Sequence, residues 1–325
     1  MLHSIASPQL WVITVAALVA LLAADFVVTH RPHDVPMREA IGWSVFYLTL
    51  PALFGLVVWH AYGSEPAVEF YTGFVVEKSL SVDNLFVFML LLAAFAVPPA
   101  LAQRVLLYGI AGALVLRGIF IAAGAAVLET GTWAFLLFGA VLLATACKVV
   151  RDAVRHQEYH VDIDKMRSVR LIRRVFPVTA QYHGGRLTVR QGMRRALTPL
   201  AVVVIAVFMT DIVFAFDSVP AVYGVTEDPY LVFATNAFAL LGLRALYFVL
   251  RNVLDRVRHL DYGLGVILAF IGVKLVLHWA HGLWPSLPEL PTTLSLAVIA
   301  VTLAAVTATS MVANRREAAS YTPQG

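Results

Sequence analysis

The sequence predicts an all-α polytopic membrane protein with about nine transmembrane helices. Hydrophobic residues make up 60% of the 325 residues and charged residues only 14%, whereas a soluble domain has about 25% charged residues. The apolar residues also gather in runs of roughly 20, the length at which a helix crosses the hydrocarbon core of a bilayer. Because lipid cannot satisfy backbone hydrogen bonds, we expect these runs to be helical.

Nine apolar runs follow one another along the chain. They cover residues 10–30, 41–61, 70–96, 105–127, 132–150, 198–222, 230–250, 262–281 and 292–312. They divide the chain into two N-terminal helices (1–68), a first three-helix unit (69–150), a hydrophilic loop (151–197), a second three-helix unit (198–281) and a last helix with its tail (282–325).

The basic residues predict the orientation. Of the 24 lysines and arginines, five lie within spans and the other 19 lie in the loops of one side, eleven of them in residues 151–195. Loops rich in Lys and Arg stay in the cytoplasm. We therefore expect a multi-pass protein of the inner (plasma) membrane with its N-terminus outside and its C-terminus in the cytoplasm. The net charge of +4 is then a topological signal, and we expect no nucleic-acid partner.

The long hydrophilic loop contains residues that could bind a metal ion, namely His156, Glu158, His160, Asp162 and Asp164. Two histidines four residues apart share one face of a helix. We favour a solvated cytoplasmic loop, and metal sensing by this segment is the alternative.

The spans on either side of this loop repeat the same order of charged residues. Residues 77–84 read EKSLSVDN and residues 211–218 read DIVFAFDS, so each segment has an acid, then an Asp six positions later, then a small polar residue. An arginine follows in the next span of each unit (Arg117 and Arg244), and a lysine in the one after (Lys148 and Lys274), nine positions beyond a glycine. Since the two units enter the membrane from opposite sides, the pattern predicts a 3+3 inverted-topology repeat. Such repeats form substrate sites near the membrane midplane.

The repeated polar residues indicate a site for a hard cation. A charge at the centre of a membrane helix costs from about 2.5 to more than 10 kcal/mol, so it persists when something pairs with it. We predict metal ligands at Glu77, Asp83, Asn84, Asp211, Asp217 and Ser218. These oxygen donors suit manganese, magnesium or calcium better than zinc or copper(I).

Residues six positions apart on an ideal helix point about 120° away from each other. Each acid pair therefore converges only if the helix is broken, which Pro220 favours in the sixth span, or the two acids serve different neighbours. A purely structural role is the alternative, in which the acids neutralise their charge partners Arg117, Arg244, Lys148 and Lys274 in buried salt bridges. Weaker polar candidates are Asp25, Glu69, Asn236, His278 and His281.

Two segments resemble the TerC family of membrane proteins: EFYTGFVVEKSLSVDNLFVF at residues 69–88 and TDIVFAFDSVPAVYGVTEDPYLVFATNAFALLGLRALYFVL at residues 210–250. The resemblance extends over nearly the whole chain. It implies an inner-membrane protein associated with manganese export and homeostasis, and with tellurium (tellurite) resistance. The family's intramembrane acids map onto Glu77, Asp83, Asp211 and Asp217. Many members carry a further acid three residues before the first Asp of the second segment, where this chain has Phe208, so the number of carboxylate ligands stays open.

The leading functional hypothesis is a secondary transporter that exports a divalent cation, manganese by preference, in exchange for protons. The alternative is a membrane scaffold or stress-resistance component without transport activity. We expect no enzymatic activity and no tightly bound cofactor, because the sequence contains no nucleophile motif, phosphate loop, haem or zinc signature. The expected partners are the divalent ion and the lipid bilayer; the sequence does not specify an oligomeric state.

Overall fold

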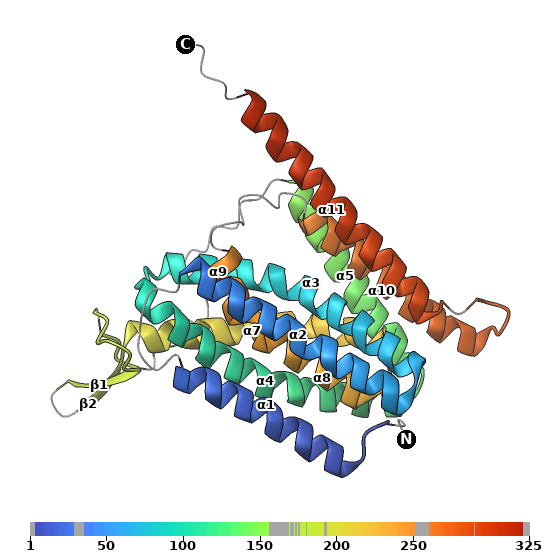
Figure 1. Ribbon diagram of the computed structural model, residues 1–325, viewed down its shortest axis with the longest axis horizontal. Helices are drawn as coiled ribbons and strands as arrows, with labels where there is room; N and C mark the ends of the chain where they lie inside the picture. Colours follow the sequence, from blue (N-terminus) through green and yellow to red (C-terminus); the bar gives the residue numbers. More distant parts are fainter. Residues whose placement is uncertain are drawn as a thin grey trace.

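The chain folds into a bundle of long helices with one small β-hairpin (Figure 1). The computed structural model describes residues 4–28, 36–155, 169, 172, 174, 176–179, 181–191, 194–250, 260–288 and 290–320. The helices are α1 (Pro8–Val28), α2 (Met37–Tyr62), α3 (Ser64–Ala94), α4 (Pro99–Glu129), α5 (Trp133–Val154), α7 (Pro199–Tyr223), α8 (Pro229–Leu241), α9 (Leu243–Leu250), α10 (Leu260–Leu283) and α11 (Thr292–Ser320). The prediction of an all-α polytopic protein is confirmed.

The helices have the length and surface of membrane spans. Within the described residues, eight helices are long and apolar enough to cross a bilayer, and α8 and α9 together form one of them. Large apolar side chains point outward from these helices, among them Val12, Val57, Val115 and Val301, each more than 60% exposed. A soluble protein would bury such residues, so their exposure fits a lipid-facing surface.

Helix α3 corresponds to the third predicted span but is not among those eight. It is 31 residues long, and it contains the charged residues Glu77, Lys78 and Asp83 in its middle. Its apolar content is lowered by the very residues that the sequence singles out as functional.

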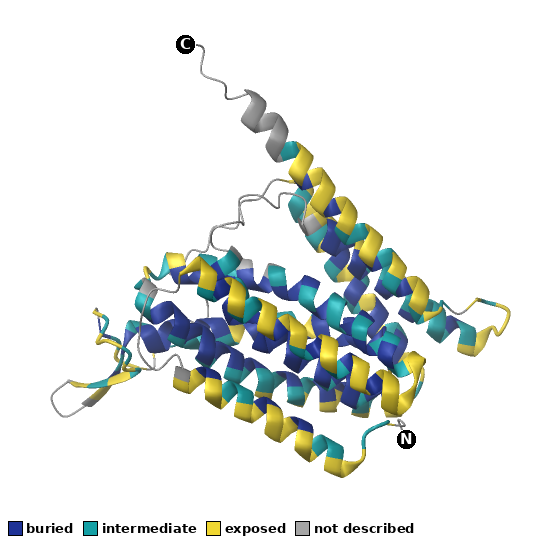
Figure 2. Ribbon diagram, in the orientation of Figure 1, coloured by how far each residue is buried: buried dark blue, intermediate teal, exposed yellow. Residues whose placement is uncertain are grey.

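Burial increases from the periphery of the bundle to α8 (Figure 2). In the most apolar window of the α8–α9 span 83% of the residues are buried, compared with 17% in α1 and 17% in α11. Helix α8 packs mainly against α3 and α4, and α7 packs against the same two helices, while α5, α10 and α11 lie together at an angle to the rest of the bundle (Figure 1). The centre of the molecule is therefore formed by one helix pair from each predicted three-helix unit.

Two spans begin at well-capped N-termini. Thr198 precedes α7 and accepts a hydrogen bond from the N–H of Ala201 at 3.3 Å, and Asp228 precedes α8 and accepts one from the N–H of Tyr230 at 2.8 Å. A proline follows each cap at the first helical position, where its missing N–H costs no hydrogen bond.

The predicted break at Pro220 is wrong. Helix α7 runs through Pro220 to Tyr223. The seventh span is interrupted instead, at Gly242, which separates α8 from α9. The ammonium group of Lys78 in α3 donates to the carbonyl of Ala239, just before this break, at 3.3 Å. A Cβ at position 242 would lie 2.9 Å from that ammonium nitrogen, so glycine leaves room for Lys78.

Helices α5 and α10 pack closely through glycines in a reciprocal way. A Cβ on Gly139 of α5 would lie 2.8 Å from Val276 of α10, and a Cβ on Gly265 of α10 would lie 2.4 Å from Val150 of α5. Gly139 and Gly265 are the glycines that the repeat predicts to be equivalent. Val150 and Val276 are likewise equivalent, since each lies eleven positions beyond its glycine. This reciprocity is what a two-fold relation between the units requires, and it supports the predicted repeat.

The hydrophilic loop contains a hairpin that the sequence analysis missed. Strands β1 (Thr188–Gln191) and β2 (Arg194–Leu197) pair antiparallel, with Thr188 opposite Leu197. The hydroxyl of Tyr182 donates to the carbonyl of Phe95 at the end of α3, at 2.8 Å. Burial raises the pKa of this phenol further above neutral pH. The segment with His156, Glu158, His160, Asp162 and Asp164 lies outside the described residues.

Candidate functional site

Four helices bring polar side chains together at the centre of the bundle. The guanidinium of Arg117 in α4 forms an ion pair with Glu77 of α3 and a second one, at 3.5 Å, with Asp211 of α7. It also donates to the side-chain oxygen of Asn236 in α8 at 2.7 Å. All four residues are at most 1% exposed. The first acids of the two repeated segments therefore meet at one arginine.

This cluster has polar atoms without partners. Within the part of the chain that the structure describes, Oε2 of Glu77 and Oδ2 of Asp211 are buried and accept no hydrogen bond, and the buried hydroxyl of Ser218, further along α7, also has no partner. Buried polar atoms are rarely left unsatisfied in native proteins. Such oxygen atoms are the ligands that a hard cation needs.

Asp217 lies six residues further along α7 than Asp211. It is close enough to Glu77 and Arg117 to interact with them electrostatically, but it forms no ion pair with Arg117 among those found in the described residues. Thus the two acids of α7 serve different neighbours, as expected for a continuous helix. Asn84 is buried in α3, and the side chain of Asp83 lies outside the described part of the structure.

The second arginine of the repeat has a different partner. Arg244, in α9, forms an ion pair with Asp25 of α1, and both side chains are 3% exposed. Tyr47 of α2 hydrogen-bonds the same aspartate, and the guanidinium lies 5.8 Å from the ring centre of Trp43. Arg244 is thus paired outside the two repeated units, and Asp25 is a buried ion-pair partner rather than an interfacial residue.

The two lysines also differ. Lys148 of α5 is exposed and lies within electrostatic range of Asp217. Lys274 of α10 is half-buried and interacts electrostatically with Glu69 and Glu227. Neither lysine forms an ion pair among those found for the described residues.

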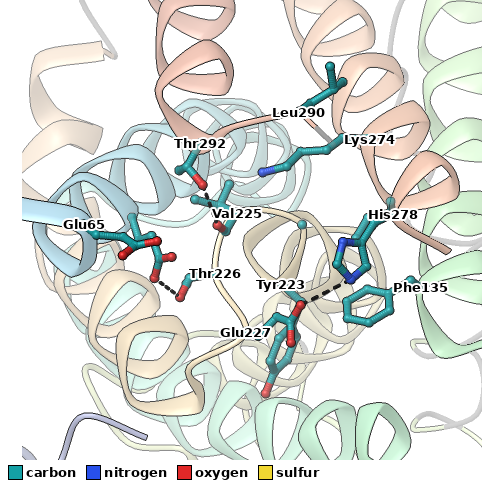
Figure 3. A pocket seen from close by; sticks show the side chains of 13 residues that line it. Glu65, Phe135, Tyr223, Val225, Thr226, Glu227, Lys274, His278, Leu290 and Thr292 are labelled. Atoms are coloured by element: carbon teal, nitrogen blue, oxygen red, sulfur yellow. Dashed lines mark hydrogen bonds and ion pairs between the residues drawn. The ribbon is translucent and has the colours of Figure 1, made fainter. Parts of the chain in front are cut away.

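Lys274 lines a cavity of about 350 Å³ at the ends of α3 and α7 (Figure 3). Glu65, Glu69 and Glu227 also line it. Thr226 donates to Glu69 at 2.6 Å, and the His278 imidazole lies 3.5 Å from the Glu227 carboxylate. Glu69 precedes Glu77 by eight residues in α3, which corresponds to about 12 Å along a helix. The cavity is an acidic mouth at the end of the helices that lead to the central cluster.

The sequence analysis missed Glu65, Thr226 and Glu227, and it placed Asn236 among the weaker candidates. Nothing in the sequence around Asn236 indicated its contact with Arg117. Its amide nitrogen donates to the carbonyl of Val232 at 2.9 Å, which leaves its oxygen facing the guanidinium. The ring of Phe208 packs against Gly112 of α4.

No three His, Cys, Asp or Glu side chains of the described residues gather closely enough to hold a metal ion. Arg117 forms ion pairs with both central acids, Glu77 and Asp211. The central oxygens therefore suit a cation in their chemistry, while their spacing in this structure is set by a guanidinium.

Comparison with known proteins identifies the family. The model of the integral membrane protein TerC family matches residues 62–318. The chain belongs to the TerC family. A membrane protein of Myxococcus xanthus, STKORF319, is 38% identical over 96% of this chain and 95% of its own length. The membrane protein MT2795 of Mycobacterium tuberculosis is 44% identical over 85% of this chain and 70% of its own length.

A third relative in Escherichia coli K12 is called the membrane-bound redox modulator Alx. It is 38% identical over 85% of this chain and 88% of its own length. The matched TerC region contains the whole central cluster and both predicted three-helix units. No solved structure matches the chain significantly.

Proposed function

We propose that this TerC-family protein is a secondary transporter that exports a divalent cation, with manganese as the expected cargo, in exchange for protons. The observation that carries the proposal is the buried pair of carboxylates, Glu77 and Asp211, whose second oxygens have no partner among the described residues. A scaffold protein has no use for such oxygens at the centre of a lipid-facing bundle, because their desolvation is costly. A transporter needs them to replace the water ligands of its ion.

The donor set supports the expected ion. Carboxylate and hydroxyl oxygens come from Glu77, Asp211, Asp217 and Ser218. Oxygen ligands are preferred by manganese, magnesium and calcium. Manganese, export as the direction and the inner membrane as the location follow from the resemblance to the TerC family rather than from the geometry.

The acidic cavity supports a route to the cluster. Its three glutamates outnumber Lys274, so the lining has a net negative charge that attracts cations to the mouth at the ends of α3 and α7, because a cleft with an excess of one sign of charge raises the local concentration of the opposite ion. With the N-terminus outside, this mouth faces the exterior, where an exporter releases its cargo.

Metal content of cells tests the proposal. Cells that express the protein should hold less manganese than cells with an empty vector, measured by elemental mass spectrometry, and purified protein in liposomes should carry Mn²⁺ across the membrane. Glu77→Gln and Asp211→Asn should each reduce transport at least tenfold, and Asp83→Asn and Asp217→Asn should also reduce it. Asp152→Asn is the matched control, because this acid lies near the end of α5 with its side chain 20% exposed.

The amount of each variant in the membrane is measured in parallel, so that loss of transport is separated from loss of insertion. Normal export by Glu77→Gln and Asp211→Asn would remove the proposed site. Unchanged manganese in both cells and liposomes with the wild-type protein would instead favour the scaffold hypothesis.

A further inference from the structure

Arg117 occupies the space between the two acids as a cation would. One of its terminal nitrogens contacts both Glu77 and Asn236, and the other lies 3.5 Å from Asp211. The guanidinium thus touches an acid from each predicted unit and a neutral amide oxygen. It is also the largest side chain among the fully buried residues of the described chain.

The arginine does not satisfy the acids fully. Among the described residues, Glu77 and Asp211 each keep one buried oxygen without a hydrogen-bond partner. The Nε and Nη2 atoms of Arg117 are also buried without a hydrogen-bond partner. A structural arginine–carboxylate pair is usually bidentate, with two parallel hydrogen bonds. Here one guanidinium is shared between two acids, which leaves oxygens free on both sides of it.

The other arginine of the repeat shows the contrast. Arg244 is paired with Asp25 from α1, and Tyr47 and Trp43 complete its surroundings. Among the described residues that group has one acid for one arginine, although the Nε atom of Arg244 is also buried without a hydrogen-bond partner. The central group has two acids in contact with one arginine, and Asp217 adds a third negative charge within electrostatic range.

We infer that Arg117 is the resident cation of the transport site, and that the cargo ion must displace its guanidinium from Glu77 and Asp211 in order to bind. This inference rests on the proposed function. It names Arg117 as the residue that sets the affinity of the site for the cargo ion. After they release the guanidinium, the two carboxylates carry two negative charges. These neutralise one divalent ion and exceed the charge of a monovalent ion. The Asn236 oxygen offers the displaced guanidinium a neutral partner that it already contacts.

Competition explains why the acids form no metal site in this structure. Glu77 and Asp211 contact different nitrogens of the Arg117 guanidinium, a planar group that is larger than a metal ion. Arg117 also gives the site a way to release its cargo, because the returning guanidinium supplies the charge that the departing ion removes. Arg117 therefore lowers the affinity for the ion and speeds its departure.

Direct binding of MnCl₂ to purified protein, followed by the loss of the free Mn²⁺ signal in electron paramagnetic resonance, tests the inference. Arg117→Gln should bind Mn²⁺ at least tenfold more tightly than the wild type, because the acids are left without their cation. In liposomes its Mn²⁺ turnover should fall, because nothing displaces the bound ion. Tighter binding combined with slower transport is a result that a merely structural arginine would not give.

Arg117→Lys provides a second variant that keeps the charge and so preserves folding. An ammonium cannot hold two carboxylates as a planar fork does, so Mn²⁺ should bind about three to ten times more tightly than to the wild type. Arg244→Lys is the matched control, with the same substitution at the equivalent position of the other unit. Its affinity for Mn²⁺ should stay within twofold of the wild type.

The outcomes separate this inference from the proposed function. If the wild type binds Mn²⁺ and Arg117→Gln and Arg117→Lys bind it equally or more weakly, the proposed role of Arg117 is overturned. The proposed transport function is not affected by that result. An equal gain in Arg244→Lys also overturns it, because the effect would not belong to the shared arginine. Absence of Mn²⁺ binding and transport in the wild type and every variant overturns both. Binding that appears only when Arg117 is replaced supports the displacement directly.

Discussion

At the scale of single residues, charge pairing decides which polar side chains this bundle tolerates. Glu77, Asp211 and Arg117 are almost inaccessible to solvent, and so are Asp25 and Arg244. Removing charges from water costs several kcal/mol for each ion, so a buried charge depends on its partner. This rule separates the Asp25–Arg244 pair from the central group around Arg117. The Asp25–Arg244 pair is balanced, whereas the central group has more acids than it needs to hold one arginine.

This difference predicts a stability effect for the balanced pair. Asp25→Asn leaves the Arg244 guanidinium buried beside a neutral amide, and removal of one partner from a buried ion pair costs about 3–5 kcal/mol. The melting temperature of the protein in detergent should therefore fall, measured by the loss of the monodisperse peak after heating. Asp152→Asn, at a partly exposed acid near the end of α5, serves as control, with an expected change within about 0.5 kcal/mol. An unchanged melting temperature for Asp25→Asn would show that Arg244 needs no charged partner.

At the scale of helices, close approach of backbones determines how α5 and α10 pack. Gly139 lies so near α10 that a Cβ would be 2.9 Å from the carbonyl oxygen of Gly272. A backbone atom cannot rotate away as the end of a side chain can. Helix association within lipid relies on such small residues, because apolar burial gives little driving force there.

The glycine contact predicts opposite effects for one substitution at two places. Gly139→Ala should separate α5 from α10 and destabilise the protein by about 1–3 kcal/mol, the usual cost of overpacking. Gly42→Ala, in α2, should be neutral or stabilise by up to about 1 kcal/mol, since alanine favours helix and nothing lies within 4 Å of its Cβ. Thermal melting of both variants in the same detergent compares them.

Equal stability of the two alanine variants would show that the α5–α10 contact can relax. Gly265→Ala is a further check on the repeat, because its Cβ would meet Val150 as that of Gly139 meets Val276. A loss of stability similar to that of Gly139→Ala is expected.

At the scale of the whole molecule, α3 decides the topology. It is the one predicted span that is not among the eight apolar helices of the described residues. If it crosses the membrane, an odd number of spans (α3, α4 and α5) separates the start of α3 from the β-hairpin. The two predicted units then enter the membrane from opposite sides.

Cysteine labelling tests this topology. In a Cys147→Ser background, which removes the single native cysteine, Ser64→Cys should react with a membrane-impermeant maleimide in intact cells. Thr188→Cys in β1 should react only after the membrane is opened. Both positions are exposed, so the difference reports the side of the membrane. Labelling of both cysteines from one side would mean that α3 does not span, and the inverted repeat would then be excluded.

The sequence was sufficient for the class of the fold and for most helix positions. Apolar runs of about 20 residues form helices in lipid whatever surrounds them, so the ends of α7 differ from the predicted span 198–222 by one residue. The small β-hairpin escaped prediction, because its strands are four residues long and rich in arginine. Such short strands depend on their neighbours rather than on an apolar pattern.

The sequence by itself determined that acids, arginines and lysines recur in the same order in two groups of spans. Only the tertiary structure decided which of them meet: Arg117 lies between Glu77 and Asp211, whereas Arg244 pairs with Asp25 outside the repeated units. The reason is physical. Spacing along one helix fixes the direction of each side chain about that helix alone, but a partner on another helix depends on how the helices rotate and cross, which is set by packing throughout the bundle.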